Sequence, residues 1–153
     1  METIFQVSNL LVLPFWLLMI LLPHWSWTRR IVSSPWIVLP AALLYAALVL
    51  PSLLTLFPAL LNPTLPGIAA LLGTPEGATI AWAHFLAFDL FVGRWAWMES
   101  RRLQMSAWVA SPILFLILMV GPVGLLLFLL ARAVSPVRNP APALAVLSST
   151  MLR

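Results

Sequence analysis

The sequence predicts an all-α integral membrane protein, a four-helix bundle with short connectors and a loose C-terminal tail. Of its 153 residues, 63% are hydrophobic and 8% are charged, and the mean hydropathy is +1.06. Soluble domains carry about 25% charged residues, so the composition excludes an ordinary water-soluble fold. The apolar residues form four long runs, each close to the roughly 20 residues that one membrane crossing needs. Any chemistry must therefore take place within the bilayer or at its edge.

The first two apolar runs, residues 5–23 and 36–57, predict the first two spanning helices. Glu2 stands where a signal peptide would have a basic region, the first run is too long for a signal core, and no small-residue cleavage site follows it. We therefore expect this helix to be retained. Pro40 and Pro51 lie near the two ends of the second run, where a membrane helix tolerates them or kinks.

The third and fourth runs, residues 77–98 and 111–130, follow a segment at 58–76 that is rich in proline and glycine. Such a composition breaks a helical pattern, so this segment predicts a loop with one short turn that lies against the membrane surface. The fourth run is almost purely apolar but is interrupted by Gly121-Pro122-Val123-Gly124. Pro122 predicts a kink in the fourth helix.

The predicted organisation is one transmembrane domain, residues 1–132, followed by a flexible tail, residues 133–153, which lacks the apolar length of a fifth span. Four spans place both termini on one side of the membrane. The connectors after the first and third predicted helices carry slightly more arginines than the side that bears both termini. This excess favours those connectors inside and the termini outside. Those arginines are Arg29, Arg30, Arg101 and Arg102. Tryptophans gather around the same connectors, as in an interfacial aromatic belt: Trp25, Trp27, Trp36, Trp95, Trp97 and Trp108.

Composition also excludes several functional classes. The chain has no cysteine, which removes disulfides, thiolate metal sites and a cysteine nucleophile. The net charge of +4 does not indicate nucleic-acid binding, because the arginines lie scattered at helix ends and form no basic stripe. One histidine lies within a predicted span and no His-x-x-His or Glu-x-x-His pair occurs, so we expect no metal and no cofactor. Two functional classes are left after these exclusions: acid–base chemistry in an apolar pocket and ligand binding in such a pocket.

The third predicted helix is the candidate site because it carries His84, Asp89 and Arg94 inside its apolar run. Asp89 lies about 12 residues into the run, near the bilayer midplane at a rise of 1.5 Å per residue. An ionisable group at that depth indicates a functional site, because its burial is costly unless it is paired or neutral. His84 and Arg94 are each about 140° away around the helix. Asp89 must therefore meet another helix or stay protonated, a state in which it can donate a proton.

These residues also have a structural interpretation. An arc of about 140° on one face of the helix holds His84, Asp89 and Glu99. Arg94 and Glu99 lie close enough to the helix end to reach the headgroups. In this structural interpretation, Asp89 makes an interhelical contact that fixes the bundle. His84 is then a buried neutral imidazole with one hydrogen bond.

A longer pattern around these residues resembles the ABA4-like family. The segment that carries the resemblance reads His84-Phe85-Leu86-Ala87-Phe88-Asp89-Leu90-Phe91-Val92-Gly93-Arg94-Trp95, followed by Glu99-Ser100-Arg101. It is similar to the family's H-x-x-A-x-D-L-F-V-G-R-W hallmark. Supporting pieces are Asn9, Pro14 and Trp16, Tyr45 with Leu50-Pro51-Ser52, Ser111-Pro112, and Gly121-Pro122-x-Gly124-Leu125-Leu126. The resemblance covers about residues 5–132.

The resemblance implies chemistry on a carotenoid. Plant members of the family are required for neoxanthin formation, in which an epoxide of violaxanthin opens to an allenic alcohol. That isomerisation needs an acid, a base and no redox cofactor. The resemblance implies that Asp89 and His84 act as acid and base, and that Arg94 or Glu99 orients the polar end group. The residues expected to contact the substrate are Asn9, Trp16, Tyr45, Phe88 and Trp95.

Three functions remain open from the sequence. The first is a cofactor-free intramembrane isomerase of a carotenoid or other isoprenoid end group. The second is a non-enzymatic carotenoid- or lipid-binding or assembly subunit, and the third is a small proton-coupled transporter, since a midplane acid also suits a proton relay. The expected partners are a lipophilic small molecule and the bilayer of a bacterial cytoplasmic membrane. The spacing of Gly121 and Gly124 leaves a homo-oligomer open, because it is a weaker association signal than G-x-x-x-G.

Overall fold

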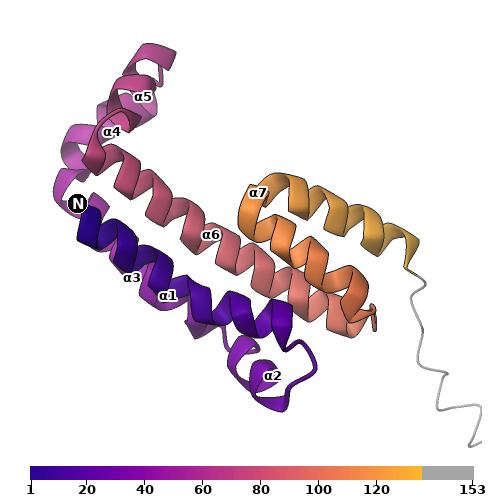
Figure 1. The fold of residues 1–153 in the computed structure, drawn as a ribbon. Coiled ribbons are helices and arrows are strands. Elements are labelled where there is room, and N and C mark those ends of the chain that lie inside the picture. The colour runs from indigo at the N-terminus through magenta and orange to yellow at the C-terminus, as the bar shows by residue number, and fades with distance from the viewer. Residues whose placement is uncertain (136–153) are drawn as a thin grey trace, which may run out of the picture.

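The computed structural model describes residues 1–135, apart from the side chain of Thr55, and this part of the chain is helical without a strand. The expected all-α class is thereby confirmed for the described residues, and most of the expected tail lies outside them. The elements (Figure 1) are α1 (Glu2–Leu21), α2 (Ser26–Val32), the 3-10 helix η1 (Pro35–Val38), α3 (Leu39–Val49), the 3-10 helix η2 (Leu50–Ser52), α4 (Leu53–Leu61), α5 (Leu65–Leu72), α6 (Pro75–Arg102) and α7 (Ala107–Val134).

Three helical segments among the described residues are long and apolar enough to cross a membrane: Glu2–Leu21, Pro35–Ser52 and Ala107–Val134. In their most apolar stretches only 22%, 11% and 28% of the residues, respectively, are buried within the protein. Most of this apolar surface therefore faces outward, where only lipid could cover it favourably. The chain is a membrane protein.

Helix α6 is the central element, and α1, α3, α5 and α7 pack against it. It begins at a capped end, where the Thr74 hydroxyl accepts a hydrogen bond from the backbone N–H of Gly77 at 3.0 Å. Arg101 and Arg102 lie in its last turn, where cations favour the negative end of the helix dipole. Its 28 residues span about 42 Å at 1.5 Å each.

Helix α1 runs parallel to α6, and α3 runs antiparallel to it. The Phe5 ring lies 5.5 Å from the ring of Trp82 near the start of α6, and His24 lies 3.2 Å from Arg101 at its end. The Tyr45 ring of α3 instead meets His84, although the chain just before α3 contacts α6 further along. The chain thus passes along α6 in alternating directions, and Figure 1 shows α1 and α3 on one side of it.

Helix α7 is a hairpin of two arms. Val120 (φ −140°, ψ 31°) and Gly121 (φ +21°, ψ −87°) are not helical, and Figure 1 shows the helix folding back there. Gly121 lies against Asp89 in the middle of α6, whereas Arg132 of the second arm pairs with Glu99 near its end. Both ends of α7 therefore lie at the C-terminal end of α6.

The tight turn of this hairpin depends on two glycines. Gly121 has a positive φ that side chains other than glycine rarely adopt. A Cβ on Gly124 would stand 2.2 Å from the backbone nitrogen of Ile117 in the first arm. A larger residue at either position would have to push the arms apart.

The expected bundle of four spanning helices is not confirmed. Helix α7 reaches only the level of Asp89 before it returns. As a result Met1 and Ser135 lie at opposite ends of α6, whereas four spans would place both termini on one side. The sequence pattern could not distinguish these cases, because an apolar run of spanning length is compatible with a straight helix or a hairpin.

The proline-rich part of the chain also differs from the expectation. The helix expected at 36–57 is divided among η1, α3, η2 and α4, and the loop expected at 58–76 contains the end of α4 and all of α5. The reason is that prolines occupy first turns, where their missing N–H costs nothing. Pro51 is the second residue of η2, and Pro66 is the second residue of α5. Thr64 caps α5 by accepting from the N–H of Gly67 at 3.3 Å.

Candidate functional site

Asp89 lies in the middle of α6 at the break in α7. Its side chain is half-buried, and its Oδ1 lies 2.8 Å from the point where a Cβ on Gly121 would stand. Within the part of the chain that the structure describes, the carboxyl group makes no hydrogen bond and no ion pair. Asp89 thus faces the break in α7 and has no basic partner among the described residues.

His84 belongs to an aromatic cluster on the α3 side of α6. Its ring stacks on Phe88 with the ring centres 4.6 Å apart and meets Tyr45 edge-on at 5.2 Å. Phe85 contacts it at 6.1 Å. The imidazole nitrogens form no hydrogen bond with any residue that the structure describes.

The structure does not bring His84 and Asp89 into contact, because His84 faces α3 and Asp89 faces α7. Between them on the helix surface lie Phe85 and Phe88, which are 56% and 60% exposed. Together with two further exposed rings of α6 they make up what we call the aromatic strip: Phe85, Phe88, Phe91 and Trp95. The two ionisable groups therefore flank an outward-facing aromatic surface.

Arg94 is engaged by the backbone around the end of α2. Its Nε donates to the carbonyl oxygens of Val32 at 2.9 Å and Ser34 at 3.2 Å, and a terminal nitrogen donates to that of Ser33 at 2.5 Å. A guanidinium is well suited to the free carbonyls at a helix C-terminus. Arg94 thus ties the connector between α2 and α3 to α6, as its structural interpretation expects. Its role in orienting a substrate stays a prediction.

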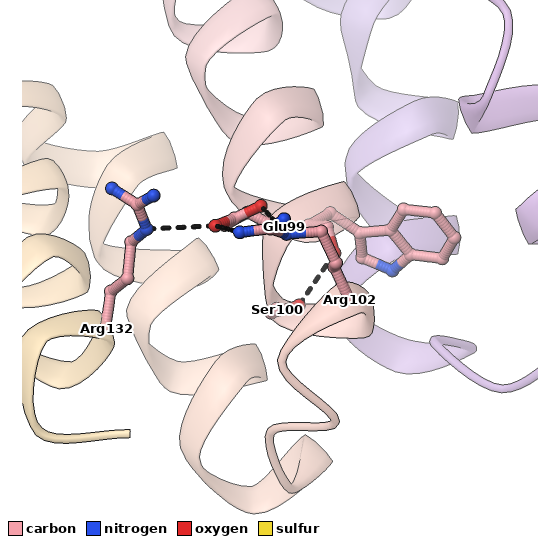
Figure 2. A network of polar contacts seen from close by, with 5 residues as sticks. Glu99, Ser100, Arg102 and Arg132 are labelled. Atoms are coloured by element: carbon pink, nitrogen blue, oxygen red, sulfur yellow. Dashed lines mark hydrogen bonds and ion pairs between the residues drawn. The ribbon is translucent and has the colours of Figure 1, made fainter. Parts of the chain in front are cut away.

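Glu99 holds the base of the α7 hairpin. Figure 2 shows its carboxylate between Arg102 and Arg132, with an N–O distance of 2.9 Å to each, and the Glu99 side chain is 12% exposed. Hydrogen bonds from Arg102 hold the pKa of this carboxyl group below its ordinary value; burial opposes this effect, and the Arg132 hydrogen bond adds to it. Glu99 is therefore a charged clamp between the two helices.

The expected substrate-contacting residues fall into two groups. Tyr45, Phe88 and Trp95 lie around His84 or on the aromatic strip, and Trp95 also meets Phe128 edge-on at 5.3 Å. Asn9 and Trp16 instead belong to the packing of α1 against α6. The Asn9 side-chain oxygen accepts from the Trp82 indole N–H at 3.0 Å, and Trp16 is fully buried against Gly93.

Sequence reasoning missed the partners of the predicted residues more than the residues themselves. Gly121 was visible only as part of a kink, and its contact with Asp89 depends on how far α7 folds back. Nothing in the sequence pairs Arg132 with Glu99, because a straight fourth helix would carry Arg132 away from that residue. In residues 1–135, no group of three or more His, Asp or Glu side chains is placed to hold a metal ion.

Comparison with known proteins assigns the chain to a family. A family model described as ABA DEFICIENT 4-like matches residues 3–128. The protein named "Protein ABA DEFICIENT 4, chloroplastic" of Arabidopsis thaliana is 28% identical over 139 residues, which cover 87% of this chain and 62% of that relative. This chain thus spans less than two-thirds of the relative's length, and the relative's chloroplast name lends no support to a bacterial cytoplasmic membrane. No solved structure matches the chain significantly. Because the family model covers most of the sequence, the chain belongs to the ABA4-like family.

Proposed function

We propose that this protein is an intramembrane isomerase that acts on an oxygenated end group of a carotenoid or another isoprenoid by acid–base chemistry without a cofactor. The observation that carries the proposal is the Asp89 carboxyl group, which has no partner among the described residues and lies beside an exposed aromatic surface. Family membership relates the chain to ABA DEFICIENT 4, and the resemblance described from the sequence implies a carotenoid substrate for this family. That relation favours a carotenoid over other lipophilic substrates.

The aromatic strip suits an extended apolar substrate. From Phe85 to Trp95 it follows α6 for about 15 Å at 1.5 Å per residue. Flat aromatic rings pack well against flat, conjugated or isoprenoid chains. Because the strip faces outward, a substrate dissolved in the bilayer can reach it without passing through water.

Asp89 is proposed as the acid. It donates its proton to the oxygen of an epoxide, and as the C–O bond breaks, its electron pair stays on the oxygen, which becomes a hydroxyl group. The carboxylate left behind faces the break in α7, where the second arm begins. The positive end of that arm's helix dipole favours a negative charge. The break in α7 thus makes proton donation easier at a depth where an isolated carboxylate would be costly.

His84 is proposed as the base. It removes a proton from a carbon next to the opening ring, and the electron pair of that C–H bond forms the new double bond. One proton is given and one is taken, so the product is an isomer of the substrate and no oxidant or reductant is needed. The acid and the base act on different atoms of one end group, and so they need not touch each other.

The test is pigment analysis in a carotenoid-producing host that expresses either the natural chain or a variant. Asp89→Asn keeps the shape of the side chain and removes the acid, and we expect it to abolish product. His84→Gln should lower product by about a hundredfold, a typical contribution of one acid–base group. Glu76→Gln is the matched control, because Glu76 is an exposed carboxylate at the start of the same helix. Full product with Asp89→Asn would remove the catalytic role.

A second candidate, a non-enzymatic carotenoid-binding subunit, is favoured by the exposure of the aromatic strip and by the separation of His84 from Asp89. In that case pigment copurifies with the protein and is lost with Phe88→Ala, while Asp89→Asn changes nothing. The pigment composition of the host then stays the same with or without the gene. The isomerase proposal expects a new pigment that depends on Asp89.

A further inference from the structure

Two cavities lie at the C-terminal end of α6, and neither Asp89 nor His84 lines them. The larger, about 1100 Å³, lies between the end of α1 and the first arm of α7. Its apolar walls include Leu21, Met105, Trp108 and Phe115. The smaller, about 490 Å³, lies between α2 and the last turns of α6. Both are lined by Pro23, His24, Arg101 and Gln104, so they adjoin each other.

The smaller cavity is lined by hydrogen-bond donors and basic groups. Arg29 and Arg101 both line it, and Arg101 lies 3.2 Å from Nδ1 of His24. Trp97 also lines it, and its buried indole N–H has no hydrogen-bond partner among the described residues. An oxygen-rich ligand would supply the acceptors that these groups lack.

Within residues 1–135, no carboxylate offsets the charge of these two arginines. Neither cavity is lined by an acidic residue. Of the four acids in the chain, Glu99 is bound by Arg102 and Arg132, Asp89 lies in the middle of α6, and Glu2 and Glu76 lie toward the far end of the helices. The cavity therefore favours an anion, and guanidinium groups bind phosphate through paired hydrogen bonds.

We propose that the two cavities together, which we call the connector site, bind a phospholipid with an anionic headgroup. The phosphate lies on Arg29 and Arg101 in the smaller cavity, and an acyl chain lies in the larger cavity between α1 and α7. The smaller cavity is charged, the larger cavity has apolar walls, and the two share a wall. Together they select an amphiphile over a free anion or a neutral oil. The connectors lie at the end of the apolar helices, which is the level of lipid headgroups. The site is independent of the proposed isomerase, because the two share no residue.

The experiment measures lipid binding to the purified full-length protein in detergent by native mass spectrometry. Phosphatidic acid, phosphatidylcholine and inorganic phosphate are the probes. We expect phosphatidic acid to bind at least about tenfold more tightly than phosphatidylcholine, a difference of about 1.4 kcal/mol. Inorganic phosphate at the same concentration should not displace the lipid, because it cannot use the apolar cavity.

Variants test the arginines directly. The double variant Arg29→Gln/Arg101→Gln should lose at least about tenfold in affinity for phosphatidic acid, as expected when charge-assisted hydrogen bonds are removed. Arg30→Gln is the matched control: Arg30 neighbours Arg29, stacks on Trp27 and lines neither cavity. Gel filtration checks that each variant stays monodisperse.

The apolar half has its own variant. Ser111→Trp fills the larger cavity and should weaken the binding of phosphatidic acid. The binding of glycerol 3-phosphate, a further probe that has the headgroup without acyl chains, should stay unchanged. Equal binding of phosphatidic acid and phosphatidylcholine, or unchanged binding by the double arginine variant, would overturn the proposal. Displacement by inorganic phosphate would also overturn it, because the site would then bind a free anion.

Discussion

Gly93 allows α1 to lie directly on α6. A Cβ at this position would stand 2.2 Å from the ring of Trp16, which is fully buried. The indole N–H of Trp16 has no hydrogen-bond partner among the described residues, so this ring contributes packing only. The residue pair explains why an aromatic side chain deep in the first predicted helix is a packing residue and no member of the interfacial belt.

Replacing Gly93 by Ala should lower the stability of the helix packing. The added methyl group overlaps the Trp16 ring, and overpacking of this kind costs about 1–3 kcal/mol. The measurement is thermal unfolding in detergent, followed by circular dichroism. Adding Trp16→Leu to the variant makes room for the methyl group and should recover part of the loss. A variant as stable as the natural chain would mean that α1 and α6 do not approach this closely.

Arg94 should behave as a structural residue. Arg94→Ala leaves three carbonyl oxygens around the end of α2 without their donor, and hydrogen bonds to charged groups are worth about 1.5–3 kcal/mol. Arg94→Lys should restore only part of this, since an ammonium cannot reproduce the geometry of the guanidinium. Thermal unfolding measures the loss. A lysine variant with natural stability and no activity would instead place Arg94 in contact with the substrate.

At the scale of elements, the α7 hairpin is the feature that sequence reasoning could not supply. The run at 111–130 has the composition and length of a spanning helix. Gly121-Pro122 predicts a kink in it but does not say how sharply the helix bends. The angle depends on contacts made by distant residues, Asp89 at the tip and Glu99 at the base. By contrast, the length of the apolar runs located the first and third predicted helices, and only their ends moved. The second predicted helix is divided among η1, α3, η2 and α4.

The hairpin predicts the side of the membrane on which each connector lies. Because the chain has no native cysteine, single cysteines can be introduced in place of Glu2, Ser106 and Ser135. Labelling of oriented vesicles with a membrane-impermeant maleimide should modify Ser106→Cys and Ser135→Cys from the same side and Glu2→Cys from the other. Labelling of Glu2→Cys and Ser135→Cys from one side would support four spans and contradict the hairpin.

The Glu99 clamp predicts a loss of stability in acid. The pKa of Glu99 lies below its ordinary value of 4.5 in the folded protein, chiefly because of the hydrogen bonds from Arg102. A lowered pKa means that the clamp contributes fully above pH 4.5 and that its contribution disappears as the pH falls below that value toward the folded pKa. The unfolding temperature should therefore fall on acidification, and the fall should be smaller in Glu99→Gln. Glu76→Gln is the control and should keep the natural pH dependence.

At the scale of the whole molecule, α6 organises both the fold and the candidate site. Helix α1 follows it along most of its length and α3 along part of it, while the α7 hairpin covers only its C-terminal half. This arrangement leaves the aromatic strip exposed, and its first two rings, Phe85 and Phe88, lie between His84 and Asp89. The scarcity of charge in the sequence was enough to single out α6, because it carries three of the four acids within or beside its apolar run. The sequence could not show that Arg94 and Glu99 have partners while Asp89 has none among the described residues. The partners of Arg94 lie around the end of α2, and one partner of Glu99 lies on α7.

The central claim, that Asp89 performs acid–base isomerisation in the membrane, is tested most directly with purified protein in liposomes. The liposomes contain an epoxide-bearing carotenoid, and no cofactor is added. We predict a product with the same mass as the substrate and a changed absorption spectrum, formed by the natural chain and by Glu76→Gln but not by Asp89→Asn. Equal product formation by Asp89→Asn, or no conversion by the natural chain while it still binds the pigment, would contradict the account.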